Sequence, residues 1–240
     1  MKILVNATPL AGLLTGISRY TRCLYQQMEI HKEARIYYFN GREAQPAMPE
    51  AAEPGQWIKR SSLFRKLPDV FSFILRSLRW KRYEYFLNRE LKSNNYDLYH
   101  ETVFSPIKTL NIPTVSTIHD LSLFTCRDMH PRERVWFYSL FFPKSIRHVH
   151  HILTISSFIK QEINQTFGIP DEKITAVPLA PAAHFEPKSE NECRKVLSHL
   201  NIPDDFFLFV GSLEPRKNLG LIIQAMASSK GRPNPSYRLG

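Results

Sequence analysis

The sequence predicts an α/β protein built on a doubly wound, mostly parallel sheet. Short apolar runs alternate with longer segments of helical periodicity along most of the 240 residues. Most apolar runs are continuous rather than alternating, which is typical of strands buried on both faces. Pro68 and Pro131 stand where helices should begin, since a first helical turn tolerates a missing N–H. Gly168, followed by Pro170, marks a helix end.

These patterns predict the following elements in chain order. Strands are expected at Ile3–Asn6, Ile36–Asn40, Leu98–His100, Thr114–Ile118, Ile152–Ile155, Ile174–Val177 and Phe206–Val210. Helices are expected at Gly16–Met28, Asp69–Leu91, Pro131–Val149, Ser157–Phe167, Glu190–Leu200 and Asn218–Ala227. Ser156 or Ser157 should cap the fourth helix, because a serine hydroxyl accepts a hydrogen bond from a free N–H of the first turn. The stretch Ala44–Gly55, with its prolines, is predicted to be a surface loop.

The order of the elements predicts two domains and a linker. Residues 1–180 hold most of the strands and should form a Rossmann-like amino-terminal domain. The stretch Pro178–Pro187 contains three prolines and no helical period, so residues 181–203 are expected to hold a linker and one helix. Residues 204–240 contain one predicted strand, which cannot complete a doubly wound sheet. We expect them to be the incomplete start of a second Rossmann-like domain.

The composition is that of a soluble globular protein, with 43% hydrophobic and 22% charged residues. The formal net charge of +10 suits phosphorylated substrates, anionic lipid headgroups or nucleic acid, and does not choose among them. Cys23, Cys126 and Cys193 lie far apart, which argues against a disulfide scaffold. No apolar run has the length of a transmembrane helix. We therefore expect a cytoplasmic protein that is at most peripheral on the inner face of the plasma membrane.

Two segments at the ends of predicted strands carry candidate binding residues. Gly16 opens a helix whose first N–H groups and dipole can face an anion, and Arg19 adds a positive charge. His119 and Asp120 directly follow the strand Thr114–Ile118, and ligands of open α/β sheets bind outside the carboxyl ends of strands. His119 can hydrogen-bond a ligand hydroxyl. A tight turn at Gly16 and a histidine bonded to a neighbouring loop are the plainer alternatives.

A third segment, Phe209–Asn218, runs from an apolar strand through Gly211 to two adjacent cations at a helix start. Arg216 and Lys217 can neutralise a diphosphate, because guanidinium and ammonium groups pair with phosphate oxygens. A solvated basic pair explains the same residues, but the preceding strand and glycine turn favour phosphate binding.

Together these segments resemble the retaining glycosyltransferases of family 4, which have the two-domain GT-B architecture. The similarity extends to about Met226, and the run Glu214–Asn218 is its most specific part. That run is similar to bacterial mannosyltransferase-like enzymes that build surface polysaccharides. The segments that carry the resemblance are Lys2–Ala7 with Thr15–Tyr20, Tyr99–Thr102, Thr117–Ser122, Ile155–Lys160, Val177–Pro181 and Gly211–Asn218.

The resemblance implies transfer of a hexose, with mannose the leading candidate, from a GDP- or UDP-linked sugar to a saccharide or lipid-linked saccharide. It implies that Arg216 and Lys217 bind the donor diphosphate and that Gly16 lies beside the donor phosphates. His119 would be the catalytic residue, in contact with the transferred sugar near the reacting carbon. Further candidate contacts to the acceptor or the sugar are Arg19, His100, Glu101, Asp120 and Ser156.

The resemblance also implies retention of configuration, with the leaving phosphate helping to deprotonate the acceptor hydroxyl. No dedicated protein nucleophile, metal or further cofactor would then be needed. The family's second domain normally carries two glutamates separated by seven residues, and no two glutamates of this sequence have that spacing. A second hypothesis therefore stays open: a catalytically inactive fragment that keeps only acceptor or membrane binding.

Motifs of other enzyme classes are missing from the sequence. It contains neither the G-x-x-x-x-G-K-[ST] phosphate loop nor a D-x-D motif. His100–Glu101 begins like a zinc protease motif, but Phe104 stands where the second histidine is needed. His148, His150 and His151 lie where a helix should end and a strand begin, a common place for cations. We therefore expect no metal site.

The basic and aromatic region Ser62–Lys92 has two interpretations. It can lie on an anionic membrane surface, or its helix can break near Leu78 or pack on both sides within the core. The same region could contact nucleic acid, but no nucleic-acid-binding module accompanies it, so we expect no such partner. On a helical projection its apolar side chains form two opposite groups: Phe71, Ile74, Leu75 and Leu78, and Trp80, Tyr83, Leu87 and Leu91.

Overall fold

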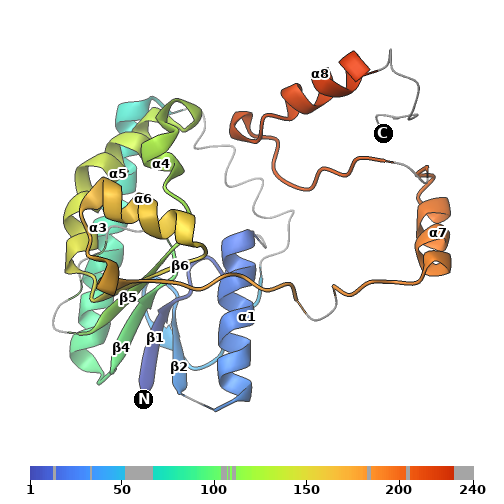
Figure 1. Cartoon of the computed structure of the whole chain (residues 1–240). Coiled ribbons are helices and arrows are strands. Elements are labelled where there is room, and N and C mark those ends of the chain that lie inside the picture. The colour runs from blue at the N-terminus through green and yellow to red at the C-terminus, as the bar shows by residue number, and fades with distance from the viewer. Residues whose placement is uncertain are drawn as a thin grey trace. The chain divides into compact units, whose positions relative to one another are not determined.

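The computed structural model describes residues 1–12, 15–32, 34–51, 67–103, 107, 109, 112–182, 185–203 and 206–229. The chain divides into two compact units, Met1–Ala180 and Pro181–Gly240 (Figure 1). None of the helices in the described part of the chain combines the length and the hydropathy needed to span a bilayer.

The first unit is built on a seven-stranded sheet with the strand order β3-β2-β1-β4-β5-β6-β7. Neighbouring strands are parallel except β3, which is antiparallel to β2. The order reverses at β1, because β2 lies on one side of it and β4 on the other. The space outside the carboxyl ends of β1 and β4 is therefore a topological switch point, where such sheets bind ligands. The strands are β1 (Lys2–Asn6), β2 (Arg35–Phe39), β3 (Ala44–Gln45), β4 (Leu98–Glu101), β5 (Thr114–Ile118), β6 (His151–Thr154) and β7 (Ile174–Ala176).

Helices cover both faces of the sheet, so the predicted doubly wound α/β fold is confirmed. Figure 1 shows α1 (Gly16–Ile30) on one side and α3 (Asp69–Ser93) with α5 (Arg132–Ser145) on the other. This placement follows from the right-handed crossovers that connect parallel strands. Shorter elements of this unit are α4 (Ser122–Thr125), α6 (Ser157–Phe167) and the 3-10 turns η1 (Arg127–Met129), η2 (Ile146–His148) and η3 (Asp171–Lys173).

Alternate side chains of β1 pack on opposite faces of the sheet. Val5 joins Tyr25 of α1 in one apolar cluster, and Leu4 joins Leu87 of α3 in another. A third cluster forms around Ile118, between β5, β6, α5 and α6. Burying one such side chain stabilises the fold by roughly 1.5–3 kcal/mol. These layers hold the strand ends in place and so fix where the candidate site residues lie.

Local capping signals set the helix boundaries. Thr15 and Ser18 form a capping box at the start of α1. Ser156 accepts a hydrogen bond from the backbone N–H of Ile159 at 3.3 Å, which confirms the predicted cap of α6. Gly168 ends α6 with φ +65°, a left-handed conformation that glycine adopts without steric cost.

Two predictions for the first unit need correction. The segment Pro131–Val149 is not one helix: α5 ends at Ser145 and tightens into η2, two residues after Pro143. Proline has no backbone N–H for the helical ladder, which weakens the last turn. Strand β3 lies in the stretch predicted to be a loop, because a turn at Gly41 (φ +99°) folds the chain back onto β2.

Helix α3 runs without interruption from Asp69 to Ser93, so the predicted break near Leu78 is wrong. The alternative prediction, that both apolar sides of this helix pack within the core, is also wrong. Trp80 packs against the core, whereas Phe71 and Leu78 are 63% and 62% exposed. Residues 62–66, which belong to the same predicted region, lie outside the described residues.

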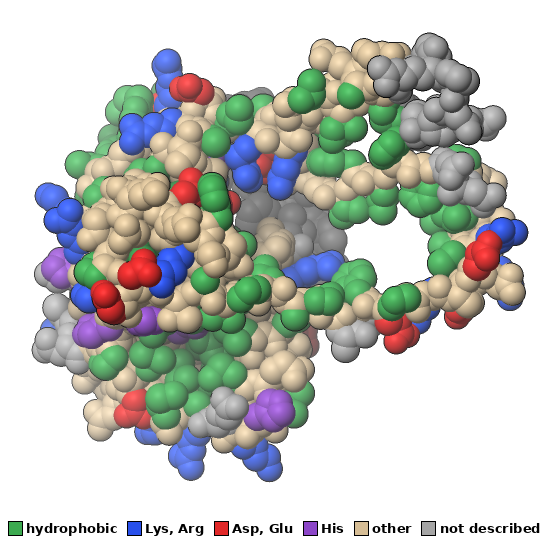
Figure 2. Space-filling view, viewed as in Figure 1, with side chains coloured by type: hydrophobic (Ala, Val, Ile, Leu, Met, Phe, Trp, Pro, Cys, Tyr) green, Lys and Arg blue, Asp and Glu red, His purple; other side chains and the backbone are tan. Residues whose placement is uncertain are grey.

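The second unit contains α7 (Glu190–His199), the 3-10 turn η4 (Pro215–Lys217) and α8 (Leu219–Ser229). The predicted strand Phe206–Val210 is wrong, because these residues have no strand partner. An extended segment becomes a strand only when a neighbour pairs with its backbone, and the described residues of this unit include no other strand. Leu208 and Val210 are 74% and 84% exposed, and Figure 2 shows apolar side chains uncovered along this unit.

Candidate functional site

The carboxyl ends of β1, β4 and β5 bring polar side chains to one edge of the sheet. Asn6 ends β1, His100 and Glu101 end β4, and His119 follows β5. Glu101, the last residue of β4, pairs with Ser116 of β5, and β5 continues beyond it to Ile118. The sheet therefore gathers three residues that were predicted from widely separated motifs.

The Glu101 carboxylate links β1, β4 and α3. Its Oε1 accepts hydrogen bonds from the Asn6 amide at 2.6 Å and from the Val103 backbone N–H at 3.1 Å. Its Oε2 accepts one from the Tyr99 hydroxyl at 2.7 Å, and that hydroxyl lies 3.1 Å from the Tyr83 hydroxyl of α3. Because Glu101 is only 2% exposed, we infer that it positions the sheet edge. Its predicted contact with a ligand stays a prediction.

Burial raises the pKa of Glu101 to about 7, and the hydrogen bonds from Tyr99, Asn6 and Val103 oppose part of this rise. In the unfolded chain the pKa is about 4.3, so the folded state binds the extra proton between these two pH values. The free energy of unfolding should therefore fall as pH rises through this window, by roughly 3–4 kcal/mol in total. Glu101→Gln has no titrating carboxyl and should lose this component of the pH dependence.

Urea denaturation of both proteins at pH 5 and pH 8 tests this expectation. The native protein should lose more unfolding free energy between the two pH values than Glu101→Gln does. Equal losses would show that Glu101 titrates normally in the fold.

His100 lies on the opposite face of the sheet, toward α1. Its Nδ1 hydrogen-bonds the Tyr25 hydroxyl, and its Nε2 lies 2.8 Å from Thr117 Oγ1. Burial, together with a smaller effect of nearby His119, lowers the pKa of His100 to about 4. The ring is therefore neutral at physiological pH, with both nitrogens engaged inside the protein. We infer that His100 joins α1 to β4 and β5, and its contact with a ligand stays a prediction.

His119 keeps one ring nitrogen unused. A ring N–H donates to the Thr102 backbone carbonyl, whereas the buried Nε2 has no partner among the described residues. The ring packs edge-on against Tyr20, with ring centroids 4.9 Å apart. Burial lowers the pKa of His119, although the Thr102 carbonyl and Asp120 oppose this change. The imidazole is thus neutral, and with Nδ1 donating, Nε2 carries a lone pair that can accept a hydrogen bond from a ligand hydroxyl.

Gly16 lies at the exposed amino terminus of α1, after the carboxyl end of β1. A Cβ added at this position meets no atom within 4 Å, so the fold itself does not require glycine here. The free space lets a ligand approach the backbone closely. Arg19, one turn later, is exposed. Binding by these two residues stays a prediction.

Asp120 and Ser156 act in local turns. Asp120 accepts hydrogen bonds from the backbone N–H and the hydroxyl of Ser122, at 3.0 and 2.7 Å. Ser156 caps α6. These bonds explain both residues structurally, and the predicted contacts with a saccharide stay predictions.

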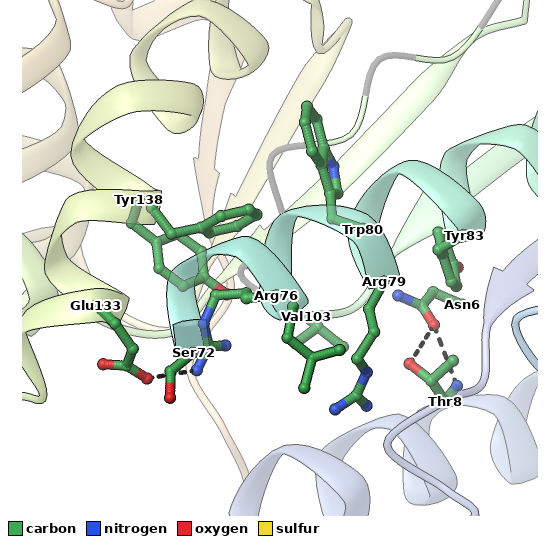
Figure 3. A pocket seen from close by; sticks show the side chains of 12 residues that line it. Asn6, Thr8, Ser72, Arg76, Arg79, Trp80, Tyr83, Val103, Glu133 and Tyr138 are labelled. Atoms are coloured by element: carbon green, nitrogen blue, oxygen red, sulfur yellow. Dashed lines mark hydrogen bonds and ion pairs between the residues drawn. The ribbon is translucent and has the colours of Figure 1, made fainter. Parts of the chain in front are cut away.

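Sequence reasoning missed a cavity of about 380 Å³ between α3 and α5, at the β1–β4 switch point (Figure 3). One side of α3 lines it, through Ser72, Arg76, Arg79 and Tyr83. The spacing i, i+4, i+7, i+11 places these side chains on one helical face. That spacing is visible in the sequence, where both arginines lie within the basic region Ser62–Lys92.

Arg216 and Lys217 belong to the second unit, in η4. The Arg216 guanidinium lies 3.6 Å from the Glu214 carboxylate, and its Nε is buried without a partner among the described residues. Lys217 is exposed. Their binding of a donor diphosphate stays a prediction.

Comparison with known proteins shows which family has this arrangement. The profile of Glycosyltransferase Family 4 matches residues 15–180, more than half of the chain and nearly all of the first unit. The chain belongs to glycosyltransferase family 4. The matched range includes Gly16, His119 and the residues of α3 and α5 that line the cavity.

The chain is also similar to one relative in sequence and to one solved structure in fold. The chain is 29% identical over 235 residues to O-antigen chain mannosyltransferase B of Escherichia coli, covering 94% of this chain and 59% of the relative. The crystal structure of HepE of Anabaena, in complex with UDP-glucose, superimposes with a TM-score of 0.53 at 16% identity, covering 99% of this chain and 59% of that one. The fold is therefore of the GT-B type, and the chain spans about three fifths of the length of these relatives.

The histidines that follow α5 in this family 4 member, His148, His150 and His151, do not form a metal-binding cluster. Thr114 donates its backbone N–H to His150 Nδ1 at 3.1 Å, whereas His151 Nε2 lies 2.8 Å from Thr175 Oγ1. Among the described residues, no three His, Cys, Asp or Glu side chains come together as a metal site. That the protein needs no metal and no further cofactor stays a prediction.

Proposed function

We propose that this family 4 glycosyltransferase transfers a hexose, with mannose the leading candidate, from a GDP- or UDP-linked sugar to a saccharide or lipid-linked saccharide. The observation that carries the proposal is His119. Its neutral ring presents an unused Nε2 at the carboxyl end of β5, close to the β1–β4 switch point. The 29% identity to a mannosyltransferase supports mannose as the sugar.

The reaction is a substitution at the anomeric carbon with retention. The bond from that carbon to the donor phosphate breaks, a bond to the acceptor oxygen forms on the same face, and the acceptor proton moves to the departing phosphate. His119 Nε2 accepts a hydrogen bond from the transferred sugar and orients it. Gly16 and the amino terminus of α1 lie beside the phosphates, while Arg216 and Lys217 neutralise the leaving group. This scheme needs neither a metal nor a further cofactor.

A transfer assay tests the function directly. The protein is incubated with GDP-mannose, UDP-glucose or UDP-galactose and a saccharide acceptor, and both nucleotide release and product configuration are measured by NMR. We expect a retained linkage with one of these donors. An inverted product would remove the retaining scheme, and acceptor binding without any turnover would identify an inactive fragment.

A lipid-linked acceptor places the enzyme at the anionic inner face of the plasma membrane, and the solvent-exposed face of α3 suits that surface. Phe71, Ile74 and Leu78 are 63%, 47% and 62% exposed, and their spacing of i, i+3, i+7 aligns them. The same stripe continues toward the carboxyl end of α3 with exposed Arg82 and Arg89. Apolar side chains can enter the headgroup region while the arginines meet anionic lipid.

Replacing Phe71, Ile74 and Leu78 together with serine should weaken binding to vesicles that contain phosphatidylglycerol by about tenfold or more. These side chains are exposed in the fold, so thermal stability should change little. Phe158→Ser, at an equally exposed position of α6, is the control and should leave vesicle sedimentation unchanged. Equal sedimentation of the triple variant and the native protein would contradict membrane contact through α3.

A further inference from the structure

The cavity between α3 and α5 combines an open position with positive charge. It lies over the carboxyl ends of β1 and β4, where Asn6, Thr8 and Val103 form part of its wall. Figure 3 shows the side chains of Arg76 and Arg79 extending from α3 into this space. A volume of about 380 Å³ lies within the range of small-molecule sites, about 300–1,000 Å³.

The two arginines have different environments. Arg76 Nη2 lies 2.9 Å from the Glu133 carboxylate of α5, and its guanidinium carbon is 6.0 Å from the centre of the Phe137 ring. The ion pair and the ring hold this guanidinium in one orientation, and its Nε has no acceptor among the described residues. It therefore keeps unused donor capacity.

Arg79 is the uncompensated charge of the cavity. It is exposed and has no ion-pair partner among the residues that the structure describes. Since Glu133 balances Arg76, the charged groups that line the cavity leave one net positive charge. The neutral hydroxyls of Ser72 and Thr8 lie in the same lining. Such a set of donors favours an anion over a neutral ligand.

We propose that this cavity binds the phosphate group of the acceptor, with Arg79 and Arg76 pairing to its oxygens. The inference rests on the proposed glycosyl transfer in naming the ligand an acceptor. Aromatic rings of Trp80, Tyr83 and Tyr138 also line the cavity and give apolar surface for the pyranose that carries the phosphate. A phosphate can come from a soluble glycosyl phosphate or from a lipid-linked glycosyl phosphate, and the same guanidinium pair serves both.

The network under the cavity supports this arrangement. Thr8 donates its hydroxyl and its N–H to Asn6 Oδ1 at 2.7 and 3.1 Å, and the Asn6 amide donates to Glu101. Tyr83 reaches the same carboxylate through Tyr99. Asn6, Thr8 and Tyr83 of the cavity lining are thus held in place before a ligand arrives, which lowers the entropic cost of binding.

Calorimetric titration of the full chain with mannose 1-phosphate, inorganic pyrophosphate and methyl mannoside tests the inference. Mannose 1-phosphate should bind more tightly than the neutral methyl mannoside, with an affinity that falls as salt is added. Arg79→Ala should weaken mannose 1-phosphate binding by about 10- to 100-fold, and Arg79→Lys should retain part of the affinity. Arg35→Ala removes the same charge at the amino edge of the sheet and should have no effect.

Phosphatidylcholine vesicles that carry a polyprenyl mannosyl phosphate distinguish the two sources of phosphate. If Arg79 contributes to binding of these vesicles but not of mannose 1-phosphate, the ligand is the lipid-linked glycosyl phosphate. If Arg79 contributes to binding of both, the site recognises the glycosyl phosphate with or without the lipid. Equal binding of methyl mannoside, or no effect of Arg79→Ala in either titration, overturns the inference. These titrations do not require turnover. If the protein transfers no sugar but still binds the phosphate through Arg79, the proposed function is wrong and the phosphate site is still supported.

Discussion

Replacing Arg216 and Lys217 together with alanine should reduce hexosyl transfer by about 10³-fold or more, effectively to background. A departing nucleoside diphosphate gains negative charge in the transition state, so the loss of both cations removes stabilisation where it matters most. Arg216 is held by Glu214 at 3.6 Å, a long ion pair that a diphosphate can replace. The measurement is turnover with the preferred nucleotide sugar, together with donor affinity by calorimetry.

The control for this variant is a second adjacent pair of cations in the same unit. Arg194 and Lys195 of α7 are both exposed, and Arg194 pairs with Glu190 one turn earlier. Arg194→Ala with Lys195→Ala removes the same charge and should keep near-native turnover. Near-native turnover of the Arg216 and Lys217 double variant would exclude their diphosphate role, whereas equal losses in both variants would indicate a general effect of net charge.

Replacing His119 should reduce transfer by about 10²-fold when the substitute lacks an atom at the Nε2 position. His119→Asn can still donate to the Thr102 carbonyl but does not reach the space occupied by Nε2. His119→Gln places an amide near that space and should retain more activity. Higher activity of His119→Gln than of His119→Asn would indicate contact between His119 and the sugar. Higher activity of His119→Asn would indicate that His119 only supports the loop at Thr102.

The pH profile gives an independent test of His119. Burial lowers its pKa below the usual value near 6.5, so the ring is neutral through the physiological range. Protonation in acid converts Nε2 from an acceptor to a donor, and turnover should fall once the pH drops below the lowered pKa of His119. His119→Gln should lack this acid limb. If the acid limb persists unchanged in His119→Gln, it belongs to another group, and the neutral-acceptor role of His119 is wrong.

The sequence by itself determined the α/β class and most elements of the first unit. The predicted strand Ile3–Asn6 begins with three consecutive apolar residues, a pattern typical of a sheet buried on both faces. Gly168 and Ser156 fixed the ends of α6 through backbone chemistry that acts within one helical turn. His119 was also predicted from sequence, because it follows a strand and strand ends in such sheets gather at one edge. Glu101 was a candidate only through the family resemblance.

Only the tertiary structure decided which side chains meet across long sequence separations. Glu101 bonds Asn6 across 95 residues, and Arg76 pairs with Glu133 across 57. The face of α3 that carries the arginines became a cavity wall because α5 packs beside it, and the opposite stripe stayed exposed. The run Phe206–Val210 reads as a strand, yet a strand forms only when a neighbour pairs with its backbone, which no local pattern specifies.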